Sequence, residues 1–336
     1  MHLADFDYEL PDDRIAQVPL EPRDAARLLV DRGVGAPDHR HVRDLADELR
    51  EGDLLVVNDS KVIPARLRLQ RASGGAAEVL LLEPLEPTRR DWEAMVRPAR
   101  KLRVGERLFT SGGVELVEIG RRTAAGDTTE ITIVGEGDPL DLLDRFGEMP
   151  LPPYITTVLG AQDRYQTVYA SEPASAAAPT AGLHFTPGLL DRLAAMGVQT
   201  ARVELVVGLD TFKPVSEADP TQHQIHSERY RVTPEVLEQC SAATRVVAVG
   251  TTSVRALESA TTFGELEGRT RLFIHGSYEW KVVDLLMTNF HMPRTTLLMM
   301  IDAFVGERWR RLYETAIGED YRFLSFGDAM LLDRRA

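Results

Sequence analysis

Hydrophobic and polar positions alternate in two different ways along the 336-residue chain. Before Asn58, short apolar runs typical of buried strands cover Arg27–Val30 and Leu54–Val57, and helical spacing covers Pro11–Gln17 and His41–Leu49. Buried strands that alternate with helices predict an α/β layer in this first part of the chain.

A second pattern, of short β-type runs, extends from Ile63 to Glu136. Turn signals rich in glycine separate these runs. The expected strands are Ala65–Leu69, Glu78–Leu82, Trp92–Val96, Arg107–Phe109, Val114–Ile119 and Thr128–Val134. Short strands at this spacing predict a small β-barrel.

The first pattern returns after a helix-like stretch at Pro139–Phe146 and a proline-rich stretch at Pro150–Tyr154. Helices are expected over Leu189–Ala195, Pro234–Ala243, Val254–Ala260 and Thr295–Phe304, and strands over Ala201–Val207, Val246–Val249 and Arg271–Ile274. This order is typical of a mainly parallel sheet. We therefore predict an α/β fold, with a discontinuous main domain at residues 1–62 and 154–336 and an inserted small β-barrel domain at residues 63–153.

Composition narrows the class of protein. Apolar residues make up 43% of the chain and charged residues 27%, and no apolar run approaches the roughly 18 residues of a membrane span. The acidic start lacks the basic and apolar parts of a signal peptide, so we expect a cytoplasmic protein with no membrane role. Cys240 is the single cysteine, which excludes intramolecular disulfides and thiolate zinc sites.

Charge is unevenly distributed. The net charge of −13 argues against a protein that coats nucleic acid through bulk electrostatics. Residues 61–110 nevertheless contain 11 Lys or Arg against 6 Asp or Glu, and the cations are densest over Arg97–Arg103. This segment is either a contact for a polyanion or a strand edge that charge protects from aggregation.

The segment Ala178–Thr186 has the features of a functional loop. Pro179 and Gly182 prevent a regular helix, so Thr180 and His184 lie on a shaped loop. A histidine in such a loop can titrate near neutral pH, and a glycine lets a ligand approach the backbone. The alternative is a simple turn that leads into the next helix.

A second candidate element follows the buried strand Val246–Val249. Gly250 and the hydroxyl residues Thr251–Ser253 stand where the next helix begins, and free amides there are able to bind an anion. Ligands also bind at the carboxyl ends of sheet strands. Thr and Ser are, however, favoured helix caps without any ligand.

Other signals are weaker or absent. His226 and His291 lie in loops, and each alone is more often a structural residue; His223 and His226 are three apart but have no further metal-ligand pattern. The chain has no G-x-G-x-x-G after a strand, no P-loop and no H-E-x-x-H. A dinucleotide site, an ordinary methyltransferase loop, a P-loop enzyme and a zincin are therefore disfavoured.

Ordered motifs along nearly the whole chain resemble one family, the S-adenosylmethionine:tRNA ribosyltransferase-isomerases of queuosine biosynthesis. The matching segments are Phe6–Pro11, Asp53–Arg66, Gly147–Ile155, Asp163–Ala170, Ala178–Thr186, Gly250–Glu258, Lys281–Asp284, Thr288–Pro293 and Phe326–Leu331.

The resemblance implies an unusual use of S-adenosylmethionine as a ribosyl donor. The acceptor is the aminomethyl group of a 7-deazaguanine at the tRNA wobble position, and the products are epoxyqueuosine, adenine and methionine. S-adenosylmethionine is then a co-substrate, and no metal or redox cofactor is required. The implied partners are S-adenosylmethionine and tRNA that bears the precursor base, and a monomer is expected.

This chemistry needs proton transfer, because the sulfonium acidifies the ribose 5′-carbon and the departing adenine benefits from an acid. We assign this work among His184, His226 and His291, with Asp59 as the carboxylate alternative.

Polar residues around these candidates suit the two substrates. Arg255 is expected to pair with the carboxylate of the donor, and Asp59, Glu228 or Asp284 to read the guanine-like edge. The remaining substrate-binding candidates are Asn58, Ser60, Thr180, Gly182, Gly250, Thr251, Thr252, Ser253 and Asn289. For the tRNA backbone the candidates are Lys61, Arg66, Arg97, Arg100, Lys101 and Arg103, and the wobble base would have to leave the anticodon stack.

The chain departs from the family pattern in two places. Leu205–Phe212 replaces the usual Leu-His-Val-Gly-x-Gly-Thr-Phe, so that Val206 stands in place of a histidine and Asp210 in place of a glycine; Gly276–Tyr278 replaces Pro-Gly-Tyr. Either that histidine is dispensable or the chain is a paralogue, such as another S-adenosylmethionine or nucleoside lyase or transferase. A non-catalytic protein that binds the tRNA anticodon arm is the third possibility.

Overall fold

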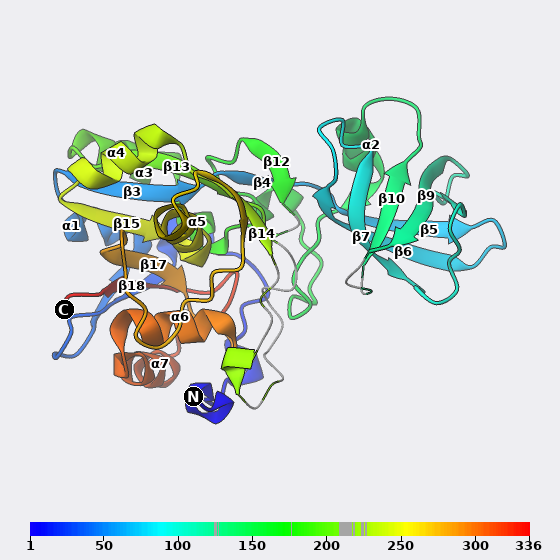
Figure 1. Ribbon diagram of the computed structural model, residues 1–336. Helices are drawn as coiled ribbons and strands as arrows, with labels where there is room; N and C mark the ends of the chain where they lie inside the picture. Colours follow the sequence, from blue (N-terminus) through cyan, green and yellow to red (C-terminus); the bar gives the residue numbers. More distant parts are fainter. Residues whose placement is uncertain are drawn as a thin grey trace. The chain divides into compact units, whose positions relative to one another are not determined.

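The computed structural model describes residues 1–123, 126, 128–175, 177–207, 217, 219–222, 225 and 227–336. The chain divides into two compact units, coloured by sequence in Figure 1. Unit 1 comprises Met1–Ser60, Pro153–Glu172 and Pro179–Ala336, and unit 2 comprises Lys61–Pro152 and Pro173–Ala178. These limits lie within two residues of the expected insertion at 63–153, but the return of the chain to unit 2 at Pro173–Ala178 has no signal in the sequence.

A nine-stranded sheet forms the centre of unit 1. In spatial order its strands are β16 (Glu267–Thr270), β14 (Glu228–Arg231), β13 (Gln199–Leu205), β3 (Asp53–Asn58), β15 (Arg245–Val249), β17 (Leu285–Asn289), β18 (Ala329–Asp333), β1 (Arg27–Val30) and β2 (Asp38–His41). Strands β13, β3, β15 and β17 are parallel to one another. The flanking β14, β16, β18 and β2 each pair antiparallel with a neighbour, while β1 pairs parallel with β18. The sheet is therefore mixed, and the expected parallel order holds for its four central strands and for this one outer pair.

Helices cover both faces of this sheet. They are α1 (Leu45–Glu48), α3 (Pro187–Ala195), α4 (Pro234–Ala242), α5 (Gly250–Phe263), α6 (Thr296–Val305) and α7 (Arg308–Gly318). Short 3-10 turns are η1 (Leu3–Phe6), η2 (Asp12–Arg14), η3 (Arg23–Ala25), η4 (Val42–Asp44), η5 (Gln162–Tyr165), η6 (Thr180–His184) and η8 (Pro220–Gln222). No helix among the described residues is both long and apolar enough to cross a bilayer.

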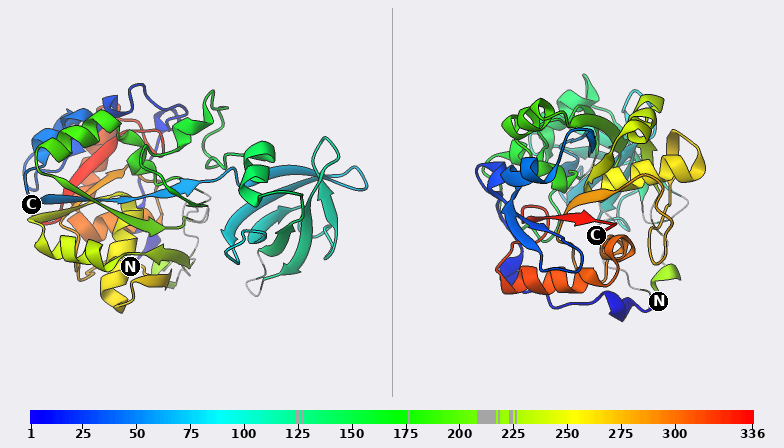
Figure 2. Two further views of the ribbon diagram at one scale, coloured as in Figure 1. Left: turned by 90° about the horizontal axis from the view of Figure 1, so that it is seen from above. Right: turned by 90° about the vertical axis from the view of Figure 1, so that its left-hand side faces the viewer.

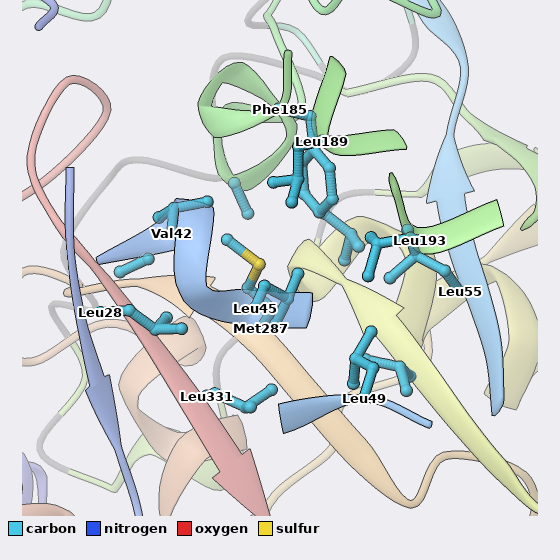
Figure 3. Close-up of a cluster of buried hydrophobic side chains, with 14 of the residues drawn as sticks. Leu28, Val42, Leu45, Leu49, Leu55, Phe185, Leu189, Leu193, Met287 and Leu331 are labelled. Atoms are coloured by element: carbon cyan, nitrogen blue, oxygen red, sulfur yellow. The ribbon is translucent and has the colours of Figure 1, made fainter. Parts of the chain in front are cut away.

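The core of unit 1 follows from the two-residue period of its strands. Leu55 and Met287 point to the face where Leu189 and Leu193 of α3 and Leu45 of α1 pack, as Figure 3 shows. The alternate strand residues point to the other face, where α5 lies, and Figure 2 shows α3 and α5 on opposite sides of the strands. The central strands are therefore buried on both faces, which explains their continuous apolar sequence.

Unit 2 contains a closed antiparallel barrel. Its strands are β5 (Arg66–Arg71), β6 (Ala76–Pro84), β7 (Asp91–Arg97), β10 (Thr129–Ile133), β9 (Glu115–Arg122) and β8 (Arg107–Phe109). The ring closes because β5 pairs with both β6 and β8. Helix α2 (Pro139–Phe146) leads into β11 (Gly147–Glu148), which also pairs with β5. The predicted small barrel is confirmed.

The structure also contains a separate two-stranded sheet, and two of the elements predicted from the sequence differ in the structure. Strands β4 (Ser60–Val62) and β12 (Glu172–Ser175) form a separate two-stranded sheet. The strand expected at Arg271–Ile274 is wrong, because β16 occupies the four residues before it. The helix expected from Pro11 is limited to the single turn η2.

Candidate ligand site at the carboxyl ends of the central strands

The carboxyl ends of β3, β15 and β17 meet at one edge of the sheet in unit 1. Val57 pairs in register with Val249, which in turn pairs with Met287, so that Asn58, Gly250 and Thr288 come next at the same level. Ligands of α/β sheets bind at this edge. Three of the segments singled out in the sequence therefore come together.

The Ala178–Thr186 segment lies against this edge. Its centre forms η6, in which Thr180 Oγ1 donates to Asn289 Oδ1 at 2.9 Å. The Asn289 Nδ2 group lies 3.1 Å from His184 Nε2 and donates to it, which leaves the imidazole proton on Nδ1. The expected functional loop is thus a fixed turn whose polar side chains join the end of β17.

Gly250 allows η6 to approach the start of α5. Its φ of +82° lies in the left-handed region, and a Cβ on it would lie 3.4 Å from the Cβ of Ala181. A residue with a side chain would therefore be strained in its backbone, while its Cβ would make ordinary van der Waals contact with η6.

The hydroxyl residues at the start of α5 are mostly buried, but they differ in their hydrogen bonds. Ser253 Oγ donates to the Val249 carbonyl at 2.8 Å, a bond within the helix that explains its presence without a ligand. Thr252 Oγ1 is buried and has no hydrogen-bond partner among the described residues. Thr252 therefore has a buried hydroxyl group that is available to a ligand.

A buried ion pair lies near this helix start. Arg255 Nη1 donates to Glu228 Oε2, and both side chains are more than nine-tenths buried. The register of β13 with β14 places Glu228 beyond the carboxyl end of β13, at the same edge as the rest of the site. Burial lowers the pKa of Arg255 to about 10, and its Nε and Nη2 groups have no partner among the described residues.

Two of the three candidate histidines are buried in their neutral form. Burial, and then the nearby cations Arg322 and Arg23, lower the pKa of His184 to about 4. Burial alone lowers the pKa of His291 to about 3, and its Nε2 lies 3.1 Å from Thr288 Oγ1. At neutral pH both rings are able to accept a proton, but neither carries one to give as an imidazolium. The third candidate, His226, lies outside the described residues, as do His223 and Asp210.

Asp59 follows directly after β3 at this edge and is almost buried. Its Oδ2 accepts from Ser171 Oγ at 2.8 Å and lies 4.0 Å from the guanidinium of Arg202. These two contacts hold the carboxylate in place at the carboxyl end of the central strand.

Asn58 and Ser60, expected to bind substrate, instead hold three strands together. Asn58 Oδ1 accepts from the Ser60 amide at 3.1 Å, from Ser60 Oγ at 2.8 Å and from the Leu205 amide at 3.2 Å, while its Nδ2 donates to the Leu205 carbonyl at 2.9 Å. Ser60 Oγ also lies 3.0 Å from that carbonyl. These strand contacts give both residues a structural role, and their contact with substrate stays a prediction.

Asp284, expected to read the modified base, lies at the wrong edge of the sheet. It directly precedes β17, so it lies at the amino end of that strand. Its Oδ2 accepts from the Val246 amide at 3.0 Å, and Arg334 and Arg335 pair with its Oδ1. These contacts make Asp284 a structural residue.

Val206, in place of the family's histidine, is buried directly after β13. Its amide donates to the Arg229 carbonyl at 2.9 Å. The missing imidazole would thus have stood at the carboxyl edge, where an apolar side chain now packs.

Within unit 2, the cations divide into paired and unpaired groups. Arg68, Arg71 and Arg107 form ion pairs with glutamates of the same unit. The six cations expected to contact tRNA form no ion pair with a described carboxylate, and all except the half-buried Arg66 are exposed; they are Lys61, Arg66, Arg97, Arg100, Lys101 and Arg103.

Sequence reasoning missed three residues that shape η6. Arg23 Nη1 donates to the Gln166 carbonyl at 2.7 Å and the Leu183 carbonyl at 3.3 Å, and the side chains of Thr167 and Tyr169 lie against Gly182. The family resemblance at Asp163–Ala170 is the only signal in the sequence for the last two.

Together, the sheet with a parallel centre and a polar carboxyl edge, and the inserted barrel with cations that pair with no described carboxylate, define a two-unit α/β protein with a candidate ligand site. A family model described as "Queuosine biosynthesis protein" matches residues 3–332. The chain belongs to this family.

Relatives of the family are similar over their full length. The chain is 51% identical to the S-adenosylmethionine:tRNA ribosyltransferase-isomerase of Symbiobacterium thermophilum, covering 99% of this chain and 100% of the relative. It is 48% identical to the protein of that name from Thermus thermophilus, with 98% and 99% covered. The crystal structure of the S-adenosylmethionine tRNA ribosyltransferase of Thermotoga maritima has 38% identity and a TM-score of 0.55, with 97% and 99% covered.

Proposed function

We propose that the chain is an S-adenosylmethionine:tRNA ribosyltransferase-isomerase. It transfers and isomerises the ribosyl group of S-adenosylmethionine onto the aminomethyl group of a 7-deazaguanine at the tRNA wobble position. The products are epoxyqueuosine in tRNA, free adenine and methionine. The observation that carries this proposal is 51% identity, over the full length of both chains, to a relative of that name.

Arg255 and Thr252 are the proposed binding groups for the carboxylate of the donor. A buried guanidinium with two unbonded N–H groups is unfavourable until an acceptor satisfies them. A carboxylate is the acceptor that an arginine fork fits best, and Thr252, one helical turn earlier, presents a further donor. Glu228 holds the guanidinium in position from its other side.

Asp59, His184 and His291 remain the described candidates for removal of the ribose 5′ proton. Asp59 is a fixed carboxylate at the carboxyl edge, and the two imidazoles are neutral acceptors. Burial disfavours the imidazolium that either histidine would become on accepting the proton, whereas protonation of Asp59 removes a charge from the site, so we favour Asp59 as the base. His226 stays a candidate from the sequence alone.

The exposed cations of unit 2 are the proposed contacts for the tRNA backbone. Contacts to phosphate are independent of sequence and fix the position of the anticodon arm, while the modified base supplies specificity. Because tRNA is the acceptor, the enzyme is expected to act in the cytoplasm, and it needs S-adenosylmethionine as a co-substrate and no resident cofactor. A monomeric enzyme remains our prediction.

Release of adenine tests the proposal. The purified protein is incubated with S-adenosylmethionine and tRNA that either bears or lacks the precursor base, and free adenine and digested nucleosides are measured by mass spectrometry. Adenine and an epoxide nucleoside should form only with the precursor-bearing tRNA.

One observation favours a second candidate function. Val206 occupies the place of a loop histidine, which is the kind of change that alters chemistry on a retained fold. Adenine release at the same rate without tRNA would indicate a lyase that acts on S-adenosylmethionine alone, and tRNA binding without turnover would indicate a binding protein.

A further inference from the structure

Thr167 and Tyr169 lie against Gly182 in η6, and each carries a buried hydroxyl group. A Cβ on Gly182 would overlap the Tyr169 hydroxyl and would lie 2.9 Å from Cγ2 of Thr167. Neither Tyr169 Oη nor Thr167 Oγ1 has a hydrogen-bond partner among the described residues. The side chains are 7% and 4% exposed, so bulk water does not satisfy these groups.

The position of both hydroxyls is fixed by well-packed surroundings. The Tyr169 ring packs edge-on against Phe185 with 6.4 Å between ring centroids, and Arg202 Nη1 donates to the Tyr169 carbonyl at 3.3 Å. Arg23 joins the Gln166 carbonyl to η6 and so holds the Thr167 segment against the turn. An unbonded hydroxyl in such a place does not stabilise the fold, because burial has removed its water without supplying a partner.

Gly182 is required here for space. Its φ is not in the left-handed region, so backbone strain does not explain the glycine. The Tyr169 hydroxyl and the Thr167 methyl group occupy the space of the absent side chain, which seats both residues on the same turn that carries Thr180 and His184.

We propose that Thr167 and Tyr169 form a subsite that hydrogen-bonds the neighbouring ribose hydroxyls of S-adenosylmethionine. This inference rests on the proposed function, because it assigns part of the donor to two further residues. They are positioning residues for the ribosyl group that the reaction transfers.

The chemistry of the two groups favours a diol over the other polar parts of the donor. Each hydroxyl both donates and accepts, and so does each hydroxyl of a ribose. The donor's carboxylate only accepts and is better matched by Arg255, and an ammonium only donates and is better matched by a carboxylate. Burial, and then the charge of Asp59, raise the pKa of Tyr169, so the phenol keeps its proton for donation.

Isosteric variants separate a ligand role from a structural one. Tyr169→Phe and Thr167→Val remove one hydroxyl each and keep the shape of the side chain. We expect calorimetry to show about three- to tenfold weaker binding of S-adenosylmethionine to each variant, with an unchanged or higher melting temperature. Tyr230→Phe is the matched control, since its hydroxyl has a partner, the Glu265 carbonyl at 2.9 Å; it should lose stability and bind the donor normally.

Deoxy analogues of the donor identify the bound group. The wild-type protein should bind the 2′-deoxy or 3′-deoxy analogue of S-adenosylmethionine more weakly than the parent compound, and the variant that lacks the matching hydroxyl should lose this discrimination. Thr167→Val provides the test if Tyr169→Phe does not fold.

Failure of this inference differs from failure of the proposed function. A wild-type enzyme that releases adenine with precursor tRNA, together with variants that bind donor and analogues as the wild type does, would overturn the ribose subsite alone and indicate that the hydroxyls hold water. A wild-type protein that binds the donor and discriminates against the analogues, but modifies no tRNA, would overturn the proposed reaction and keep the subsite. A protein that binds no S-adenosylmethionine would overturn both.

Discussion

The buried side chains of the candidate site differ in the proton transfers and hydrogen bonds that each can make at neutral pH. His184 and His291 are held neutral, so neither supplies the acid that adenine departure requires. Asp59 keeps a fixed carboxylate, and Arg255 keeps two N–H groups for an acceptor. In the proposed function, the roles of base and of carboxylate-binding group therefore fall to different residues of one edge.

The low pKa of His184 makes stability depend on pH. The unfolded chain takes up this proton near pH 6.5 and the folded chain only near pH 4, so acid favours the unfolded state between these values. Stability should therefore fall as pH decreases from about 6.5 to 4, by on the order of 1–2 kcal/mol from His184 at pH 5. Urea denaturation at pH 7.5 and pH 5 measures the loss, and His184→Gln should reduce it. An equal loss in that variant would contradict the cited pKa direction.

Thr252→Val tests the carboxylate-binding role without disturbing the Arg255–Glu228 pair. The variant removes a buried hydroxyl that has no partner among the described residues, so the melting temperature should change little. The KM for S-adenosylmethionine should rise about three- to tenfold. Ser253→Ala is the comparison, because Ser253 bonds only within its helix and should leave KM unchanged. Equal KM values for Thr252→Val and the wild type would remove Thr252 from the site.

At the scale of helices and strands, the elements that the sequence predicts correctly are those marked by a pattern of neighbouring residues. The sequence predicts a helix from Val254 to Ala260 within α5, and the glycine and hydroxyl start indicates a strand end before it. The barrel strands are recognisable because polar and apolar residues alternate on their two faces. The strand β17 has no such signal, since all five of its residues are buried and a strand that is buried on both faces gives no period of two.

Pairing between distant strands accounts for the errors at the site. Whether Asp284 lies at the amino or the carboxyl end of a strand depends on β17, and the bonds that occupy Asn58 come from Leu205, 147 residues away. No local pattern contains either fact. The motifs therefore predict which segments meet at the edge, but not which side chains are already occupied.

Two adjacent residues at the end of β3 should affect different properties. Asn58 should mainly affect the stability of the fold, and Asp59 should mainly affect catalysis. Asn58→Ala removes the acceptor and donor that join β3, β4 and β13, and should lower the free energy of unfolding by about 2–4 kcal/mol. Asp59→Asn keeps the shape of its side chain and should lower kcat at least tenfold through loss of the base, with a smaller change in stability. Denaturation and adenine release measure the two effects. Normal turnover in Asp59→Asn would exclude Asp59 as the base.

At the scale of the whole molecule, positive and negative charges are concentrated in different parts of the chain. The chain carries −13 overall, whereas residues 61–110 hold an excess of cations, eight of which form no ion pair with a described carboxylate. A generally acidic protein with one basic region binds a polyanion in one place and is repelled by it elsewhere. This arrangement suits a single tRNA arm better than unspecific coating.

Neutralising two of these cations should weaken tRNA binding in a salt-dependent way. In the Arg97→Gln, Lys101→Gln double variant, the slope of log Kd against log salt should decrease by about one for each lost phosphate contact. Arg68→Gln is the control, because Arg68 already pairs with Glu148 at 2.9 Å and should leave the slope unchanged. Titration of labelled tRNA at several salt concentrations gives the slopes. The same slope in the double variant as in the wild type would place the tRNA contact elsewhere.

Donor labelled with ¹³C in all five ribose carbons tests the ribosyl transfer most directly. After incubation with precursor-bearing tRNA, mass spectrometry of the digested nucleosides should show one modified nucleoside that carries all five labelled carbons, with one adenine released for each nucleoside formed. Label that never enters tRNA while adenine is released, or transfer of the donor's methyl group instead of its ribose, would contradict the assignment of this chain as a ribosyltransferase-isomerase.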